Sequence, residues 1–129
     1  MLVATVFIVT GLATAETDGL RKAKFIAVEF YADWCEPCAA MEQKIALLSE
    51  KYDNQPILGV VLDVTNHSSR DNAEMLASRL GLEELWPTGM ENMGDIFILD
   101  AETGELLDKL TPEESFTAMT AKVGKILAR

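Results

Sequence analysis

The sequence predicts an α/β domain in which a mixed central sheet of about four strands is flanked by helices. Two apolar runs, residues 25–32 and 57–64, have the length and composition of strands that are buried on both faces. A stretch with helical periodicity follows each run, and a hairpin pattern and a last helix complete the chain. This order predicts a mixed sheet to which the hairpin supplies the antiparallel pairs.

The first 15 residues differ in character from the rest of the chain. They carry no charge and are mostly apolar, and Ala13-Thr14-Ala15 has the small-x-small form of a cleavage site. We therefore expect residues 1–15 to be a signal peptide, residues 16–129 to form one domain, and the protein to work in the periplasm or otherwise outside the cytoplasm. No Lys or Arg precedes the apolar run, so an uncleaved membrane anchor and an extra N-terminal strand are the alternatives.

The net charge limits the classes of partner. The 129 residues carry a formal net charge of −10 at pH 7. Because no basic stripe is present to neutralise phosphates, we expect neither nucleic acid nor an anionic membrane surface as a partner.

The two cysteines of the chain form the motif Trp34-Cys35-Glu36-Pro37-Cys38 between the first strand and a helix. A helix N-terminus carries free N–H groups and the positive end of the macrodipole, so a thiolate at Cys35 would be stabilised there. Cys38 lies one turn further in, within reach to close a disulfide. Pro37 falls in the first helical turn, where its missing N–H costs nothing. This spacing predicts an attacking thiol and a resolving thiol.

Two other interpretations of the pair compete with redox chemistry. Tetrahedral zinc needs four ligands, and the single His cannot complete a set with two Cys, so we expect no metal and no cofactor. A purely structural disulfide that closes so short a loop would constrain the unfolded chain little. Redox chemistry is therefore the favoured interpretation.

The remaining helices and strands follow from local patterns. Beyond the motif, apolar residues at helical spacing give the core side of one helix, and Ser68 or Ser69 is the expected cap of the next. Residues 81–94 have the composition of an exposed loop, which either caps the core or docks a partner. The first of these helices has the expected apolar face Met41, Ile45, Leu48 and Tyr52, and the second has Met75, Leu76 and Leu80. Residues 111–114 form the expected capping box of the last helix. The apolar face of that helix is expected to consist of Phe116, Met119, Val123, Ile126 and Leu127.

The segment from Val28 to Cys38 resembles the active-site strand and helix start of the thioredoxin superfamily. The sequence of this segment is most similar to the corresponding segment of exported or membrane-attached thiol reductants, and the resemblance covers roughly residues 24–128. It implies a thioredoxin-like fold and thiol–disulfide oxidoreductase activity, with Cys35 and Cys38 as the dithiol. Protein disulfides are the implied substrates and a membrane thiol reductant the implied electron donor.

The same resemblance assigns roles to further residues. Glu29, six residues before Cys35, matches a buried acid that exchanges protons with the second thiol, and burial should raise its pKa. Val61 stands where many thioredoxins carry a lysine near that acid. Gly94 takes the place of a cis-proline that faces the dithiol, while Pro87-Thr88 has the family's dipeptide seven residues too early. The residues expected to bind substrate are Trp34, Pro37, Met93 and Gly94.

Two functions from different classes remain at this point. The favoured one is an exported reductant of protein disulfides with a potential near that of thioredoxin, about −270 mV. The alternative is a redox-inert or copper-handling interaction module that uses the Met-containing loop 83–94.

Overall fold

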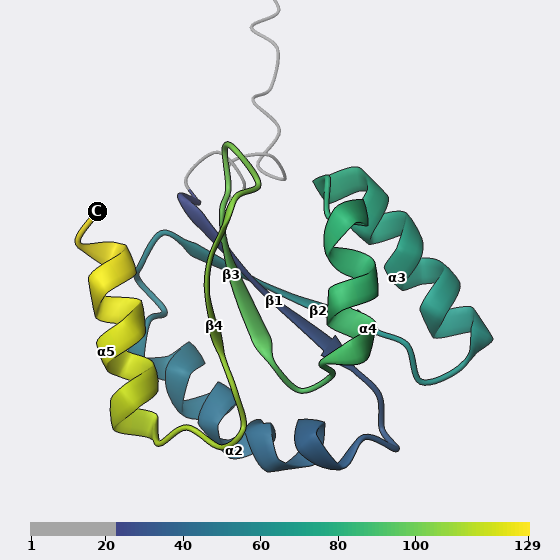
Figure 1. Cartoon of the computed structure of the whole chain (residues 1–129), viewed down its shortest axis with the longest axis horizontal. Coiled ribbons are helices and arrows are strands. Elements are labelled where there is room, and N and C mark those ends of the chain that lie inside the picture. Colours follow the sequence, from purple (N-terminus) through teal and green to yellow (C-terminus); the bar gives the residue numbers. More distant parts are fainter. Residues whose placement is uncertain (1–22) are drawn as a thin grey trace, which may run out of the picture.

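The computed structural model describes residues 23–129, and these residues form a four-stranded mixed sheet flanked by helices (Figure 1). The sheet order is β2-β1-β3-β4. The strands are β1 (Phe25–Tyr31), β2 (Ile57–Asp63), β3 (Ile96–Asp100) and β4 (Leu106–Leu110). The helices are α2 (Glu36–Lys51), α3 (His67–Leu80), α4 (Trp86–Glu91) and α5 (Phe116–Leu127), with a 3-10 turn, η1 (Glu83–Leu85), before α4. The expected fold class and hairpin are confirmed.

Strand β1 occupies the centre of the sheet and sets the register of the site. It pairs in parallel with β2 and antiparallel with β3, so that Glu29 lies between Val61 on one side and Ile96 on the other. Val61 therefore does stand beside the buried acid, as predicted. The site-bearing segment, residues 32–38, leaves the sheet at the C-terminal end of this central strand.

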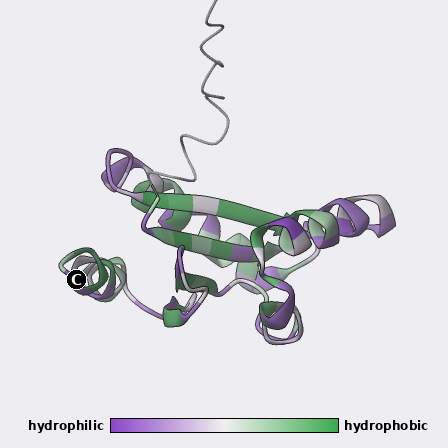
Figure 2. Cartoon of the chain, turned by 90° about the horizontal axis from the view of Figure 1, so that it is seen from above, coloured by the Kyte–Doolittle hydropathy of each residue, from purple (hydrophilic) through white to green (hydrophobic). Residues whose placement is uncertain are grey.

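The alternation of β1 divides the core into two layers, and Figure 2 shows the green strands running between helices whose outer parts are mostly purple. Ile26, Val28 and Phe30 pack with α3 on one face. Phe25 and Ala27 face α2 and α5 on the other. Because helices lie over both faces, the strand is apolar at nearly every position, as expected for a central strand.

Helix α3 packs differently from the prediction. Its cap is Asn66, whose side chain accepts the N–H of Ser69 at 3.0 Å, rather than either serine. Its buried residues are Ala73 and Ala77, whereas Met75 and Leu76 are exposed. The prediction of an apolar face at Met75 and Leu76 is therefore wrong, because small residues bring this helix close to the sheet and leave the large ones outside.

Residues 83–91 are helical, which corrects the expectation of a loop. Within this stretch Leu85 and Gly89 are buried, and the ring of Trp86 meets that of Phe30 edge-on with centroids 5.4 Å apart. A Cβ at Gly89 would overlap the Phe30 ring. The core-capping alternative is thus the one the packing supports.

The last helix begins later than the predicted capping box. Ser115, not Thr111, is its cap, since the Ser115 hydroxyl accepts the N–H of Ala118 at 3.1 Å. The preceding segment is instead fixed by Lys44 of α2, whose ammonium donates to the carbonyls of Pro112 and Glu114 at 2.6 and 2.7 Å. This contact ties α2, which carries the cysteines, to the start of α5.

Within residues 23–129, none of the helices combines the length and the apolar character needed to cross a membrane. The predicted signal peptide, residues 1–15, lies outside the described residues.

Candidate active site

Cys35 and Cys38 form a disulfide at the start of α2, with their Cα atoms 5.2 Å apart. Cys35 is the N-cap of the helix, and its sulfur accepts the N–H of Cys38 at 3.2 Å. A thiolate at this position would receive a charge-assisted hydrogen bond in addition to the field of the helix. Pro37 lies in the first turn, as predicted.

The two sulfurs differ in their surroundings. Cys38 is fully buried, with its sulfur 3.6 Å from the carbonyl oxygen of Phe30, and Cys35 keeps 7% of its surface exposed. In the reduced state the Cys38 thiol can donate to that carbonyl, which favours the neutral thiol form. The geometry therefore distinguishes an outer sulfur at the N-cap of α2 from an inner one that lies against a backbone carbonyl.

Trp34 is fixed by the loop that follows β2. Its indole Nε1 donates to the carbonyl of Thr65 at 3.0 Å, and the neighbouring Asp33 N–H is accepted by the Thr65 hydroxyl at 3.0 Å. The side chain nevertheless remains 62% exposed beside the disulfide. Thr65 is thus a positioning residue that sequence reasoning did not single out. The polar composition of residues 65–69 indicated a loop, but nothing in the local sequence linked it to Trp34.

Gly94 lies directly against the cysteine motif. A Cβ on this residue would come 2.8 Å from the Cβ of Pro37 and 3.0 Å from the backbone nitrogen of Cys38. Its φ is +93°, and its N–H donates to the carbonyl of Phe30 at 3.3 Å. The predicted position of Gly94 opposite the dithiol is confirmed, and every peptide bond among residues 23–129 is trans, including Met93-Gly94. Proline can adopt neither this φ nor this hydrogen bond, so Gly94→Pro is expected to disturb the start of α2.

Glu29 is buried in the middle of β1, with 7% of its surface exposed. Burial, followed by the negative charge of Glu42, raises its pKa from 4.5 to about 7. The folded protein therefore binds the proton more tightly than the unfolded chain. The resulting stabilisation is complete below pH 4.5 and is lost as the pH rises through about 7.

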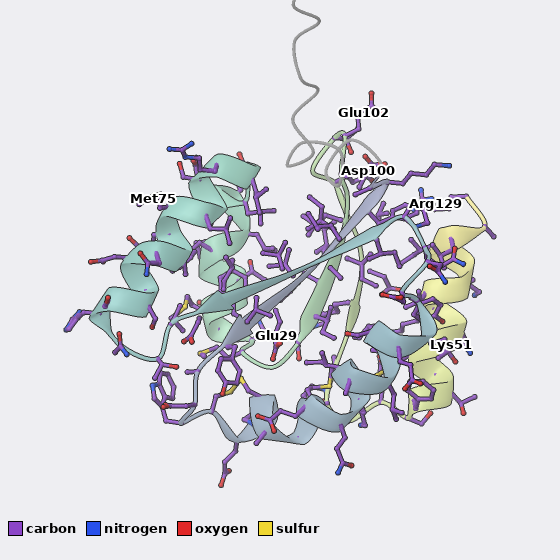
Figure 3. The ribbon with its side chains drawn as sticks, turned by 180° about the vertical axis from the view of Figure 1, so that it is seen from behind. Glu29, Lys51, Met75, Asp100, Glu102 and Arg129 are labelled. Atoms are coloured by element: carbon purple, nitrogen blue, oxygen red, sulfur yellow. A yellow bond between two sulfur atoms is a disulfide. The ribbon has the colours of Figure 1, made fainter. Side chains whose placement is uncertain are left out.

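The surroundings of Glu29 contain carboxylates rather than cations. The pKa of Tyr31 is raised by burial and by Glu42, Asp33, Asp63 and Glu29, which places these acids near one hydroxyl. Figure 3 shows Glu29 in the middle of the sheet, with Lys51 and Arg129 well away from it. Val61, which pairs with Glu29, adds no charge.

Pro87 and Met93 occupy separate places. Pro87 lies in the first turn of α4, away from the position facing the dithiol that Gly94 fills. Met93 is partly buried and packs on the core layer that contains both cysteines. The fold therefore brings Trp34, Pro37 and Gly94 to the dithiol. Their substrate-binding roles, and that of Met93, stay predictions, as do the catalytic roles of Cys35, Cys38 and Glu29.

The described part of the chain has no group of three or more His, Cys, Asp or Glu side chains placed to hold a metal ion. Methionines 90 and 93, which the copper alternative requires, are partly buried against the core.

The comparisons with known proteins agree with this geometry. A family model described as thioredoxin matches residues 12–78, slightly more than half of the chain. Thioredoxin-2 of Pyricularia oryzae is 41% identical over 46 residues, covering 36% of this chain and 27% of that protein. Thioredoxin-like protein 1 of Schizosaccharomyces pombe is 31% identical over 92 residues, covering 71% of this chain and 26% of that protein. The chain thus spans about a quarter of the length of these two relatives.

Solved structures show the same fold. A mutant thioredoxin from Halobacterium salinarum superposes with a TM-score of 0.53 at 20% identity, covering 87% of this chain and 82% of that one. The germline-specific thioredoxin Deadhead from Drosophila melanogaster gives 0.53 at 21% identity, covering 86% and 88%.

Fold and site together define a thioredoxin-fold protein with a Cys-x-x-Cys pair at a helix N-terminus. With the family model matching over half its length, the chain belongs to the thioredoxin family.

Proposed function

We propose that this protein is a thiol–disulfide oxidoreductase that reduces protein disulfides outside the cytoplasm. The observation that carries the proposal is the position of Cys35, whose sulfur caps α2 and accepts the Cys38 N–H while remaining beside the exposed Trp34. The names of the relatives agree with this class of activity. The composition of residues 1–15 supports export.

The reaction follows from the two sulfur environments. The Cys35 thiolate attacks one sulfur of a substrate disulfide, forming a mixed disulfide and releasing the other substrate sulfur as a thiolate that takes up a proton. Cys38 then loses its proton, and its thiolate attacks the Cys35 sulfur, releasing the second substrate thiolate. Two electrons pass to the substrate, and the protein is left with the Cys35–Cys38 disulfide seen in the structure.

Glu29 is the group that would take the Cys38 proton. A carboxyl with a pKa of about 7 is divided between its two forms at neutral pH, so it can both accept and return a proton. The oxidised protein must be recharged by a dithiol donor, and the location proposed above makes a membrane thiol reductant the fitting class.

Redox equilibration tests the proposal. In buffers of reduced and oxidised dithiothreitol or glutathione, one reversible two-electron couple is expected, with a midpoint closer to about −270 mV than to about −120 mV. Thiols would be counted by alkylation and mass. Cys35→Ser should abolish the couple, and in Cys38→Ser the remaining Cys35 should form stable mixed disulfides. A chain that shows no reversible couple is the redox-inert module instead, while a midpoint above about −180 mV removes only the reductant direction.

Glu29→Gln should slow the resolution of the mixed disulfide while leaving its formation unchanged, because the side chain keeps its shape but cannot accept a proton. In the wild-type protein, resolution should slow as the pH falls through about 7, where Glu29 becomes protonated. Stopped-flow measurement of Trp34 and Trp86 fluorescence between pH 6 and pH 9 would follow both steps. Equal resolution rates in the two proteins across that range would remove Glu29 from the mechanism.

A further inference from the structure

The face of the sheet that carries Glu29 is incompletely covered. A groove of about 390 Å³ lies there between α2, the edge strand β2 and the core residues of β3. Its floor is formed by Ala27 and Gly59, which are paired across β1 and β2. These two small residues leave the volume unfilled, and the groove falls within the range of about 300–1,000 Å³ that is usual for small-molecule sites.

The groove is apolar apart from one interior group. Ile45, Leu48 and Ile57 are among the side chains that line it. At its outer end, the Tyr52 hydroxyl already donates to the Thr120 carbonyl at 3.4 Å, and Ser49 and Asp53 are exposed at the rim. Glu29 is the remaining polar lining residue. It is buried, and its carboxyl makes no hydrogen bond or ion pair with any other residue in 23–129.

We propose that this groove binds a small lipophilic cation, with an ammonium group paired to the Glu29 carboxylate and an apolar body lying over Ala27 and Gly59. A buried carboxylate without a partner is costly, and a cation that arrives with its own apolar surface both neutralises it and fills the groove. Asp53 at the rim and the nearby Glu42 add attraction for positive charge. An anion would instead be repelled by the carboxylates of Glu29, Glu42 and Asp53. This site shares Glu29 with the redox mechanism proposed above, but the evidence for it, the groove and its buried carboxyl, does not rest on that function.

The charged form of Glu29 is required, so binding depends on pH. The groups that face Glu29 are Glu42 from α2 and Tyr31 from its own strand, while β2 and β3 present Val61 and Ile96. Its pKa of about 7 makes the carboxylate dominant at pH 8.5 and the neutral acid dominant at pH 5.5. A primary alkylammonium, with a pKa like that of lysine, about 10.4, stays charged at both values.

Two probes of equal length separate charge from apolar contact. Hexylammonium and hexanol would be titrated into the oxidised full-length protein, in which the cysteines do not ionise, and followed by amide chemical shifts. At pH 8.5 we expect hexylammonium to bind at least about tenfold more tightly than hexanol. That preference should vanish at pH 5.5 and in Glu29→Gln at both pH values.

A second pair of variants tests the location without touching Glu29. Gly59 has an ordinary backbone conformation and open space where a Cβ would lie, so Gly59→Leu should fold and fill the groove. It is expected to weaken both probes at least about tenfold, since their apolar contact is lost. Gly124→Leu adds the same side chain at an exposed position on α5 and should change neither affinity. The proposal is overturned if neither probe binds, if hexanol binds as tightly as hexylammonium at pH 8.5, or if Gly59→Leu leaves binding unchanged.

Discussion

Gly89→Ala is expected to lower the free energy of unfolding by about 2–4 kcal/mol. The added methyl group would overlap the ring of Phe30, which is fully buried between the rings of Trp86 and Phe97. Phe30 cannot move away, because its strand is hydrogen-bonded on both sides. Helix α4 must therefore shift from the sheet and lose apolar contacts.

Urea unfolding monitored by tryptophan fluorescence would measure this loss. Gly124→Ala is the matched control, since it is also a helical glycine but has open space around it. In that variant alanine should raise the free energy of unfolding by about 0.5–1 kcal/mol, through helix propensity alone. The two substitutions are therefore expected to change the free energy of unfolding in opposite directions. A stabilised Gly89→Ala variant would show that α4 does not pack on Phe30 as described.

Gly94→Pro should be the most destabilising change near the dithiol and should lower the free energy of unfolding by on the order of 3–5 kcal/mol. Proline fixes φ near −65°, whereas Gly94 has φ +93°. The substitution also removes the N–H that Phe30 accepts, and it places carbon atoms against Pro37 and Cys38. The start of α2 must then move, which disturbs the hydrogen bond from the Cys38 N–H to the Cys35 sulfur.

Gly104→Pro is the control that separates the loss of backbone conformation and hydrogen bond from the contact with the cysteine motif. Gly104 also has a positive φ, +75°, and its N–H also donates to a backbone carbonyl, that of Asp100 at 2.9 Å, but a Cβ there would touch nothing. We expect Gly104→Pro to lower the free energy of unfolding less than Gly94→Pro does. Gly104→Pro should also leave the alkylation rate of reduced Cys35 unchanged, whereas Gly94→Pro should alter that rate. A Gly94→Pro protein as stable as the wild type would contradict the observed backbone conformation.

The parts of the fold that sequence could predict are those set by local patterns. The apolar run of β1, the position of Cys35 at the start of a helix and the hairpin of β3 and β4 depend on neighbours within a few residues, and all three agree with the structure. The burial of Glu29 also followed from its place inside an apolar run.

The parts that could not be predicted depend on contacts between distant residues. Trp86-Pro87-Thr88-Gly89 has a poor helix composition, and its helix exists because Gly89 can approach Phe30. Periodicity assigned Met75 and Leu76 to the core, whereas α3 packs through the smaller Ala73 and Ala77. The left-handed conformation of Gly94 likewise follows from its contact with Pro37, 57 positions earlier in the chain.

The attachment of Trp34 to Thr65 has a consequence for the newly made chain. The two residues are 31 positions apart, so the hydrogen bond that fixes Trp34 beside the dithiol cannot form until β2 and the loop after it have left the ribosome. At a synthesis rate of about 5–20 residues per second, both thiols are present for a few seconds in a chain that cannot yet orient them. During that interval the pair has the reactivity of ordinary unfolded cysteines, and disulfides in the same compartment can exchange with it. The orientation of the pair by Trp34 and Thr65 therefore has to wait until β1 and β2 have both been made and have paired.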